Sequence, residues 1–340
     1  MLNVTRHGVI LAQTSLYFEN EGVFNPAVFY ENGVVHLFYR ALSKRNHSSI
    51  GYCLLDTPLH IKHRSRFPLI HPSRDYESKG MEDPRIVKLD DIYFLSYTAF
   101  DGTNALGALA LSSNLHEFYR WGIIVPLILA TEKVLDGLPV NATTVTGNYH
   151  FQLKKDPNIE FIWDKNIVFF PRRIQGRICF FHRIKPCILL VFISNLSDIN
   201  SDFWDNYLKG LPTHALDCEK LKIKDALYVG AGCPPIEIPD GWLFIYHAVY
   251  SINNVLIYKA HCSLLDLNNP QSVLAYLPYP LLEPELEWEK IGNVNNVVFP
   301  TGAFLNDETL FFYYGAADKC IGCASFNLHE LLTEFTYINT

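Results

Sequence analysis

Short apolar runs, rich in Val, Ile, Phe and Tyr and bounded by Gly, Asp, Asn and Pro, follow one another along most of the chain. This spacing is typical of β-strands joined by tight turns. The sequence carries no long amphipathic helical pattern, and its main helix candidates are two short stretches, residues 196–208 and 327–335. We therefore predict an all-β fold.

One pattern recurs along the chain: a Pro, a short apolar strand, a polar turn, and a second apolar strand that ends in an aromatic residue and a polar one. In the first copy a strand begins at Asn25 and a second strand ends at Arg40. The copies are marked by Pro26, Pro84, Pro171, Pro235 and Pro300, at steps of 58, 87, 64 and 65 residues. Each step has room for a four-stranded antiparallel sheet, as in one blade of a β-propeller.

The repeat predicts a five-bladed β-propeller formed by residues 1–340 as a single domain; the alternative is a β-sandwich with coincidental hairpins. The longest step indicates an inserted loop or lid at about 127–164. Equivalent positions of a propeller meet near its axis, so we expect five polar side chains to converge there: Asn25, Arg40, Asp83, Arg183 and His247. An acid, an amide, two guanidiniums and an imidazole indicate a polar site for an anion and a sugar.

Composition narrows the class of protein. Of the 340 residues, 49% are hydrophobic, which is ample for a large core. The net charge is −7 and there is no long Lys/Arg run, which argues against nucleic-acid or membrane partners. The sequence has no signal-peptide pattern at its start and no apolar stretch of about 18 residues. We interpret its eight scattered cysteines, including the lone pair Cys320 and Cys323, as ordinary strand residues of a cytoplasmic protein.

The second copy of the repeat contains GMEDPRI, Gly80 to Ile86, followed by YFLSYTA, Tyr93 to Ala99. These segments resemble the signature of the β-mannoside phosphorylases of glycoside hydrolase family 130. Four further blocks resemble the family in the same order and span nearly the whole chain: Phe24–Ala27 with Tyr39–Ala41; Lys165-Asn166 with Phe170-Pro171 and His182-Arg183; Gly241-Trp242 with Tyr246-His247 and Tyr258; and Asn296–Gly302 with Tyr314–Asp318.

The resemblance implies a five-bladed propeller and an inverting, glycosyltransferase-type reaction. Inorganic phosphate attacks the anomeric carbon of a terminal β-mannosyl unit and gives mannose 1-phosphate. The resemblance makes Asp83 the general acid. The phosphate-binding positions are Lys165, Arg183, His247 and Tyr258, and the sugar-binding positions are Asn25, Arg40 and Asp318. We add three substrate-binding candidates: Glu82, Arg85 and Phe299. The alternative for Glu82 and Arg85 is a structural ion pair, and the alternative for Phe299 is a position in the hydrophobic core.

The residue types suit this chemistry. A phosphorylase needs one carboxyl group because phosphate arrives as an anion, but it needs cations to hold that anion. A β-mannosidase of the same family would lack the cations and carry a carboxylate base. A non-catalytic sugar-binding propeller would need neither.

The expected partners are a β-mannoside oligosaccharide and phosphate as co-substrate, with no other cofactor and no metal. The reducing-end sugar stays open among mannose, glucose, N-acetylglucosamine and a longer oligomannoside. The oligomeric state also stays open, a homo-oligomer included.

Overall fold

A computed structural model of the chain describes residues 1–128 and 161–338. Strands make up most of its regular structure, so the strand-rich chain predicted from the sequence is confirmed. The insertion predicted at 127–164 lies largely outside the described residues.

The described strands pair into three sheets of 4, 11 and 6 strands, and within these sheets antiparallel pairing defines five groups. Short parallel bridges, one between the first and second groups and one between the second and third, join these three groups into the largest sheet. The first contains β2 (Gly22–Glu31), β3 (Val34–Leu42), β4 (Ser48–Thr57) and β5 (His60–Arg64). The second contains β6 (Gly80–Leu89), β7 (Ile92–Phe100), β8 (Ala105–Ser112) and β9 (Tyr119–Ile123). The third contains β10 (Asp164–Phe169), β11 (Ile178–Ile184) and β12 (Cys187–Ile193).

The last two groups bring the chain ends into the sheets. The fourth contains β13 (Ala226–Ala231), β14 (Ile236–Ile238), β15 (Gly241–Ile252), β16 (Val255–Leu265), β17 (Val273–Tyr276) and β21 (Thr336–Tyr337). The fifth contains β18 (Val298–Asn306), β19 (Thr309–Ala316), β20 (Cys320–Asn327) and the first strand of the chain, β1 (Thr5–Leu11).

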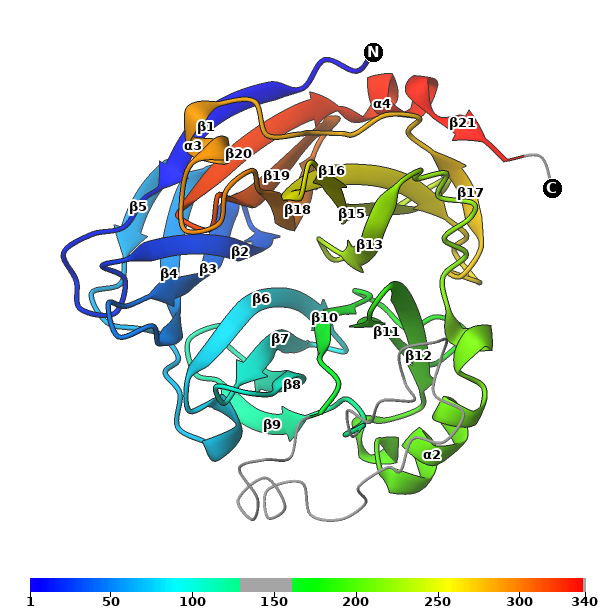
Figure 1. Cartoon of the computed structure of the whole chain (residues 1–340), viewed down its shortest axis with the longest axis horizontal. Coiled ribbons are helices and arrows are strands. Elements are labelled where there is room, and N and C mark those ends of the chain that lie inside the picture. The colour runs from blue at the N-terminus through cyan, green and yellow to red at the C-terminus, as the bar shows by residue number, and fades with distance from the viewer. Residues whose placement is uncertain (129–160, 339–340) are drawn as a thin grey trace.

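The five groups surround a common centre (Figure 1). Their inner strands contact one another in order, β18 with β2, β2 with β6, β6 with β10, and β10 with β13. The pairing of β1 with β20 joins the two ends of the chain in one sheet. The hairpin turns predicted from the sequence have left-handed residues where two-residue turns need them, including Asn32 and Gly33 (φ 54° and 78°).

In residues 1–128 and 161–338 the helices are short: α2 (Ser201–Lys209), α3 (Glu287–Lys290) and α4 (Leu328–Glu334), with 3-10 turns at Asp75–Glu77, Leu196–Asp198 and Leu211–His214. The two helix candidates of the sequence overlap α2 and α4. Each of these begins after an Asn whose side chain accepts a backbone N–H: Asn200 from Phe203 at 3.0 Å and Asn327 from Glu330 at 3.1 Å.

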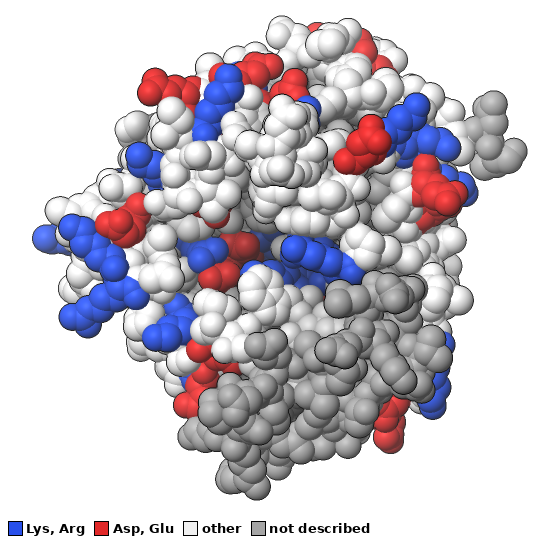
Figure 2. Space-filling model, viewed as in Figure 1, with Lys and Arg blue, Asp and Glu red and all other residues white. Residues whose placement is uncertain are grey.

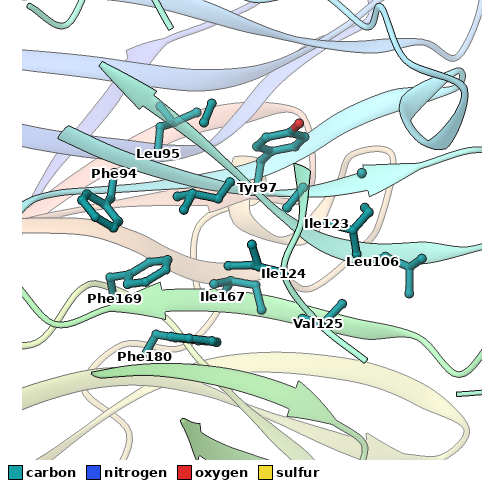
Figure 3. Close-up of a cluster of buried hydrophobic side chains, with 14 of the residues drawn as sticks. Phe94, Leu95, Tyr97, Leu106, Ile123, Ile124, Val125, Ile167, Phe169 and Phe180 are labelled. Atoms are coloured by element: carbon teal, nitrogen blue, oxygen red, sulfur yellow. The ribbon is translucent and has the colours of Figure 1, made fainter. Parts of the chain in front are cut away.

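Apolar side chains fill the space between neighbouring groups. Between the second and third groups, the rings of Phe94 and Phe169 lie 5.2 Å apart, and those of Phe169 and Phe180 lie 4.8 Å apart (Figure 3). Gly107 lets Ile167 approach β8, because a Cβ there would collide with it. Burial of each such ring stabilises the fold by about 1.5–3 kcal/mol. This packing holds the strand ends that face the centre.

The third copy of the repeat differs from the sequence prediction. β10 ends at Phe169, and the chain from Phe170 to Arg177 forms the connection to β11. Pro171 has no N–H for a ladder hydrogen bond, which disfavours it inside a strand. Phe170, which precedes this Pro, is therefore a core residue and does not face the centre.

Candidate active site

A narrow cavity of about 220 Å³ lies among the inner strands. Figure 2 shows acidic and basic side chains side by side in a hollow at the centre of this face. The structure brings ten of the eleven predicted site residues to its walls: Asn25, Arg40, Glu82, Asp83, Lys165, Arg183, His247, Tyr258, Phe299 and Asp318.

Three of the polar side chains enter the cavity from the same kind of backbone irregularity. The strand pairing of β2, β6 and β10 shifts register at Asn25, Asp83 and Asn166, whose φ angles are 50°, 51° and 56°. Such a β-bulge re-aims a side chain, and Asn and Asp tolerate the left-handed conformation better than most residues. The bulges therefore explain why short polar residues stand at these positions in otherwise apolar strands.

One side of the cavity carries the carboxyl groups. Asp83 Oδ1 accepts a 2.8 Å hydrogen bond from Asn25 Nδ2 and lies 3.4 Å from Arg40 Nη1. Arg40 also donates from Nη2 to Glu82 Oε1 at 2.7 Å and from Nε to Ser48 Oγ at 2.8 Å. The guanidinium is thus held by three side chains and binds the two acidic residues together.

The two aspartates of the cavity have pKa values shifted in opposite directions. Burial alone would raise the pKa of Asp83, but the Arg40 and Arg85 guanidiniums and the Asn25 hydrogen bond outweigh it and lower the pKa. Burial raises the pKa of Asp318 to about 7, against the opposing effect of Arg40. In the free protein Asp83 is therefore ionised at neutral pH, whereas Asp318 titrates there.

Arg85 lies behind the cavity wall and does not line it. It is 1% exposed, and it donates to the backbone oxygen of Gly232 at 2.6 Å and to that of Asp83 at 2.7 Å. Its guanidinium therefore braces the backbone of the Asp83 bulge. Glu82 pairs instead with Arg40, and its carboxylate lies 3.8 Å from Lys165 Nζ. Glu82 and Arg85 therefore do not form an ion pair with each other.

The other side of the cavity is cationic. Lys165, Arg183 and Lys185 all line this side. The pKa of Lys185 is lowered, mainly by burial and also by the charges of Arg183 and Lys165. Within the described residues, neither Arg183 nor Lys185 has a carboxylate within 4.0 Å. The positive charge on this side is thus only partly balanced.

Several buried nitrogen atoms on the cationic side have no hydrogen-bond partner: Arg183 Nε, Asn166 Nδ2 and both ring nitrogens of His247. Burial and the neighbouring cations lower the pKa of His247 well below its usual range, so its ring is neutral and carries one N–H. Unpaired buried donors beside cations are the arrangement that binds an anion with several acceptor oxygens.

Six further cavity residues were missed as site candidates: Trp163, Asn166, Lys185, Tyr228, Val294 and Val297. The bulge pattern shared with Asn25 and Asp83 is the signal that identifies Asn166. Lys185 follows Arg183 by two residues on the same strand end, a weaker signal. Tyr228 donates to or accepts from Tyr258 at 3.0 Å and lies under Lys185, with Nζ 4.3 Å from the ring centre. Only the tertiary structure brings it there.

Across residues 1–128 and 161–338, no group of three or more His, Cys, Asp or Glu side chains is arranged to hold a metal ion. Within the same part of the chain, no helix has the length and apolar character to span a bilayer.

Comparison with known proteins defines the class. The family model for glycoside hydrolase family 130, described as beta-1,4-mannooligosaccharide phosphorylase, matches residues 11–336. The chain therefore belongs to glycoside hydrolase family 130.

Individual relatives are similar over nearly their whole length. A 1,2-beta-oligomannan phosphorylase of Thermoanaerobacter sp. (strain X514) is 32% identical over 95% of this chain and 96% of its own. A beta-1,2-mannobiose phosphorylase of the same organism is 31% identical, covering 90% of each chain. The solved beta-1,2-mannobiose phosphorylase of Listeria innocua has a TM-score of 0.71 at 21% identity and covers 98% of this chain and 99% of its own, which shows a shared fold.

Proposed function

We propose that the chain is an inverting β-mannoside phosphorylase that cleaves a terminal β-mannosidic bond with inorganic phosphate and releases mannose 1-phosphate. The observation that carries this proposal is the division of one narrow cavity into a carboxylate side with Asp83 and a cationic side with unpaired donors. The names of the full-length relatives support phosphorolysis and favour a β-1,2 linkage.

We propose also that the five strand groups form a five-bladed β-propeller with the cavity on its axis. The ordered contacts among the inner strands and the pairing of β1 with β20 support this architecture.

In the proposed reaction the terminal mannosyl unit occupies the carboxylate side, where Asn25, Arg40 and Asp318 contact its hydroxyl groups. Phosphate occupies the cationic side, where Arg183 offers a planar fork and Lys165 a point charge. A bond forms between a phosphate oxygen and the anomeric carbon, the bond from that carbon to the leaving oxygen breaks, and the leaving oxygen takes a proton that Asp83 supplies.

Asp83 must carry a proton to act as an acid, although its pKa is lowered in the free protein. A bound phosphate dianion offsets the positive charge of the surrounding Arg and Lys side chains, and a bound sugar excludes water from the carboxyl group. Both effects favour the neutral carboxyl form and raise its pKa. Substrate binding therefore prepares the acid.

The cations favour phosphate over water as the nucleophile. A hydrolase needs a second carboxylate to activate water, about 6.5–9.5 Å from the acid. Glu82, the nearest candidate in sequence, is held by Arg40 and faces Lys165, which weakens it as a base.

The test is incubation of the protein with β-1,2- and β-1,4-mannobiose, with and without phosphate, followed by assay of mannose 1-phosphate and free mannose. We expect mannose 1-phosphate only when phosphate is present. Equal release of mannose without phosphate would identify a hydrolase, and no turnover on a broad panel of mannosides would identify a sugar-binding protein.

The Asp83→Asn variant tests the acid. We expect the fold to persist and kcat to fall roughly 10²- to 10⁴-fold, as when general acid catalysis is removed. The measurement is mannose 1-phosphate formation, with circular dichroism as the control for folding. A variant with near-normal turnover would remove Asp83 from this role.

A further inference from the structure

An exposed tryptophan stands at the rim of the cavity. Trp163 directly precedes β10, lines the cavity and is 48% exposed. Large aromatic side chains that are exposed beside a polar cavity commonly mark a contact surface for a ligand.

Three contacts hold the Trp163 indole in place. Its Nε1 donates a 2.9 Å hydrogen bond to the backbone oxygen of Thr103, and Lys165 Nζ lies 4.5 Å from the ring centre. The edge-to-face contact with Phe100 has a centroid distance of 6.4 Å. A ring that is already ordered loses little conformational entropy when a ligand covers it.

The contact network connects this indole to the acid side of the cavity. Lys165, which lies against the ring, is 3.8 Å from Glu82, the neighbour of Asp83. In an inverting reaction the nucleophile and the leaving group lie on opposite faces of the sugar, and the acid is on the side of the leaving group. Lys165 also lines the cationic side, so Trp163 stands at the mouth of the cavity beside both sides.

The size of the cavity points to the same place. A volume of about 220 Å³ is below the roughly 300–1,000 Å³ of pockets that enclose drug-sized ligands, and it must hold a mannosyl ring and phosphate. A second sugar must therefore lie at the mouth. A second apolar rim residue is Val294, which is 39% exposed and is anchored by its N–H to the Ala317 oxygen at 3.2 Å.

We propose that Trp163 is the stacking platform for the leaving sugar, whose apolar C–H face would lie on the indole ring. Val294 supplies a second contact from the other segment of the rim. This inference rests on the proposed phosphorylase activity and concerns the subsite that gives it substrate specificity.

The test uses Trp163→Ala in the synthetic direction, with mannose 1-phosphate as donor and mannose as acceptor. We expect the KM for mannose to rise between about twofold and tenfold, the range of a lost aromatic contact, while the KM for mannose 1-phosphate stays unchanged. In phosphorolysis, the KM for phosphate should also stay unchanged. Trp121→Ala is the matched control, because Trp121 is 43% exposed and does not line the cavity.

Trp163→Phe keeps a ring at the rim and provides a second measurement if the Ala variant does not fold. With mannose 1-phosphate bound, added mannose should change the tryptophan fluorescence of the wild type and of Trp121→Phe, but much less that of Trp163→Phe. An unchanged acceptor KM in Trp163→Ala, an equal rise in the phosphate KM, or a full fluorescence change in Trp163→Phe would overturn the proposal. A wild type that forms no mannose 1-phosphate from any mannobiose would instead overturn the proposed function.

Discussion

Individual side chains in the cavity are defined by their charge environment more than by their type. Asp83 and Asp318 are both aspartates of left-handed conformation, with φ angles of 51° and 49°. Their pKa values nevertheless diverge, because Arg40, Arg85 and Asn25 all act on Asp83 whereas burial dominates at Asp318. Two carboxyl groups with separated pKa values can take different roles in one reaction.

The raised pKa of Asp318 predicts a pH dependence of stability. Between about pH 4, where an ordinary carboxyl titrates, and about pH 7, the folded protein holds a proton that the unfolded chain lacks. Stability contributed by this group is therefore full below pH 4 and is lost as the pH rises to about 7. Asp318→Asn lacks this titration, so the free energy of unfolding of the wild type should fall relative to the variant across that window.

Urea unfolding of both proteins at a series of pH values measures this difference. The comparison cancels the other titrating groups, including the histidines with lowered pKa values. A difference that stays constant from pH 4 to pH 7 would show that Asp318 titrates as an ordinary carboxyl group.

Lys185 gives a second prediction for a single residue. Lys185 is exposed, its ammonium group lies over the Tyr228 ring at the cavity wall, and it has no carboxylate partner among the described residues. We expect Lys185→Met to raise the KM for phosphate roughly tenfold, because one charge-assisted hydrogen bond contributes about 1.5–3 kcal/mol. The kinetics of phosphorolysis at varied phosphate measure the effect.

The matched control for this variant is Lys224→Met, which removes the same charge from an exposed position that does not line the cavity. The control should leave the phosphate KM unchanged. If both variants behave alike, Lys185 acts only through the general charge of the protein and does not contact phosphate.

At the scale of elements, the ends of the inner strands position the cavity side chains, and a small residue on a neighbouring strand leaves space for them. Gly230 on β13 pairs with His247 on β15, and a Cβ at this glycine would collide with the His247 ring and with Asn166 Nδ2. The absence of a side chain on one strand therefore allows two unpaired donors from other strands to meet.

Gly230→Ala should consequently disturb the phosphate side of the cavity. Displacement of His247 and Asn166 by a few tenths of an ångström or more should raise the phosphate KM at least about tenfold, since small misplacements in a catalytic site cost up to 10²-fold. Gly210→Ala is the control, because there an added methyl group meets its first neighbours at 3.4 Å. Equal phosphate kinetics in the two variants would contradict this role of Gly230.

At the scale of the whole molecule, the first strand of the chain, β1, completes the last sheet by pairing with β20. Arg6 on β1 forms an ion pair from Nε to Glu289 at 3.1 Å, and Tyr314 donates to the same carboxylate oxygen at 2.8 Å. Glu289 is fully buried, so removal of its cation would leave a buried charge with weaker compensation.

We expect Arg6→Met to lower the free energy of unfolding by about 2–4 kcal/mol, measured by urea denaturation. The control is Arg172→Met, which breaks an exposed pair with Glu237 and should cost no more than about 1 kcal/mol. Similar losses in the two variants would show that the attachment of β1 to its sheet does not depend on this buried pair.

The sequence by itself determined the class of structure and most of the candidate site. The alternation of apolar runs and turn residues is a local property, and it predicted the strands and the two helices. The repeat assigned equivalent positions to Asn25 and Asp83, and both line the cavity. The repeat also placed Arg40, Arg183 and His247 there, and the family blocks added Lys165, Tyr258 and Asp318.

Only the tertiary structure decided how these residues meet. In the third copy of the repeat, the residue at the bulge is Asn166. The Arg85 side chain lies behind the cavity wall, where it donates to the backbone oxygen of Asp83. Trp163 and Tyr228 reach the cavity through contacts between strands far apart in the chain. Such contacts depend on packing between sheets, and no local pattern of residues encodes that packing.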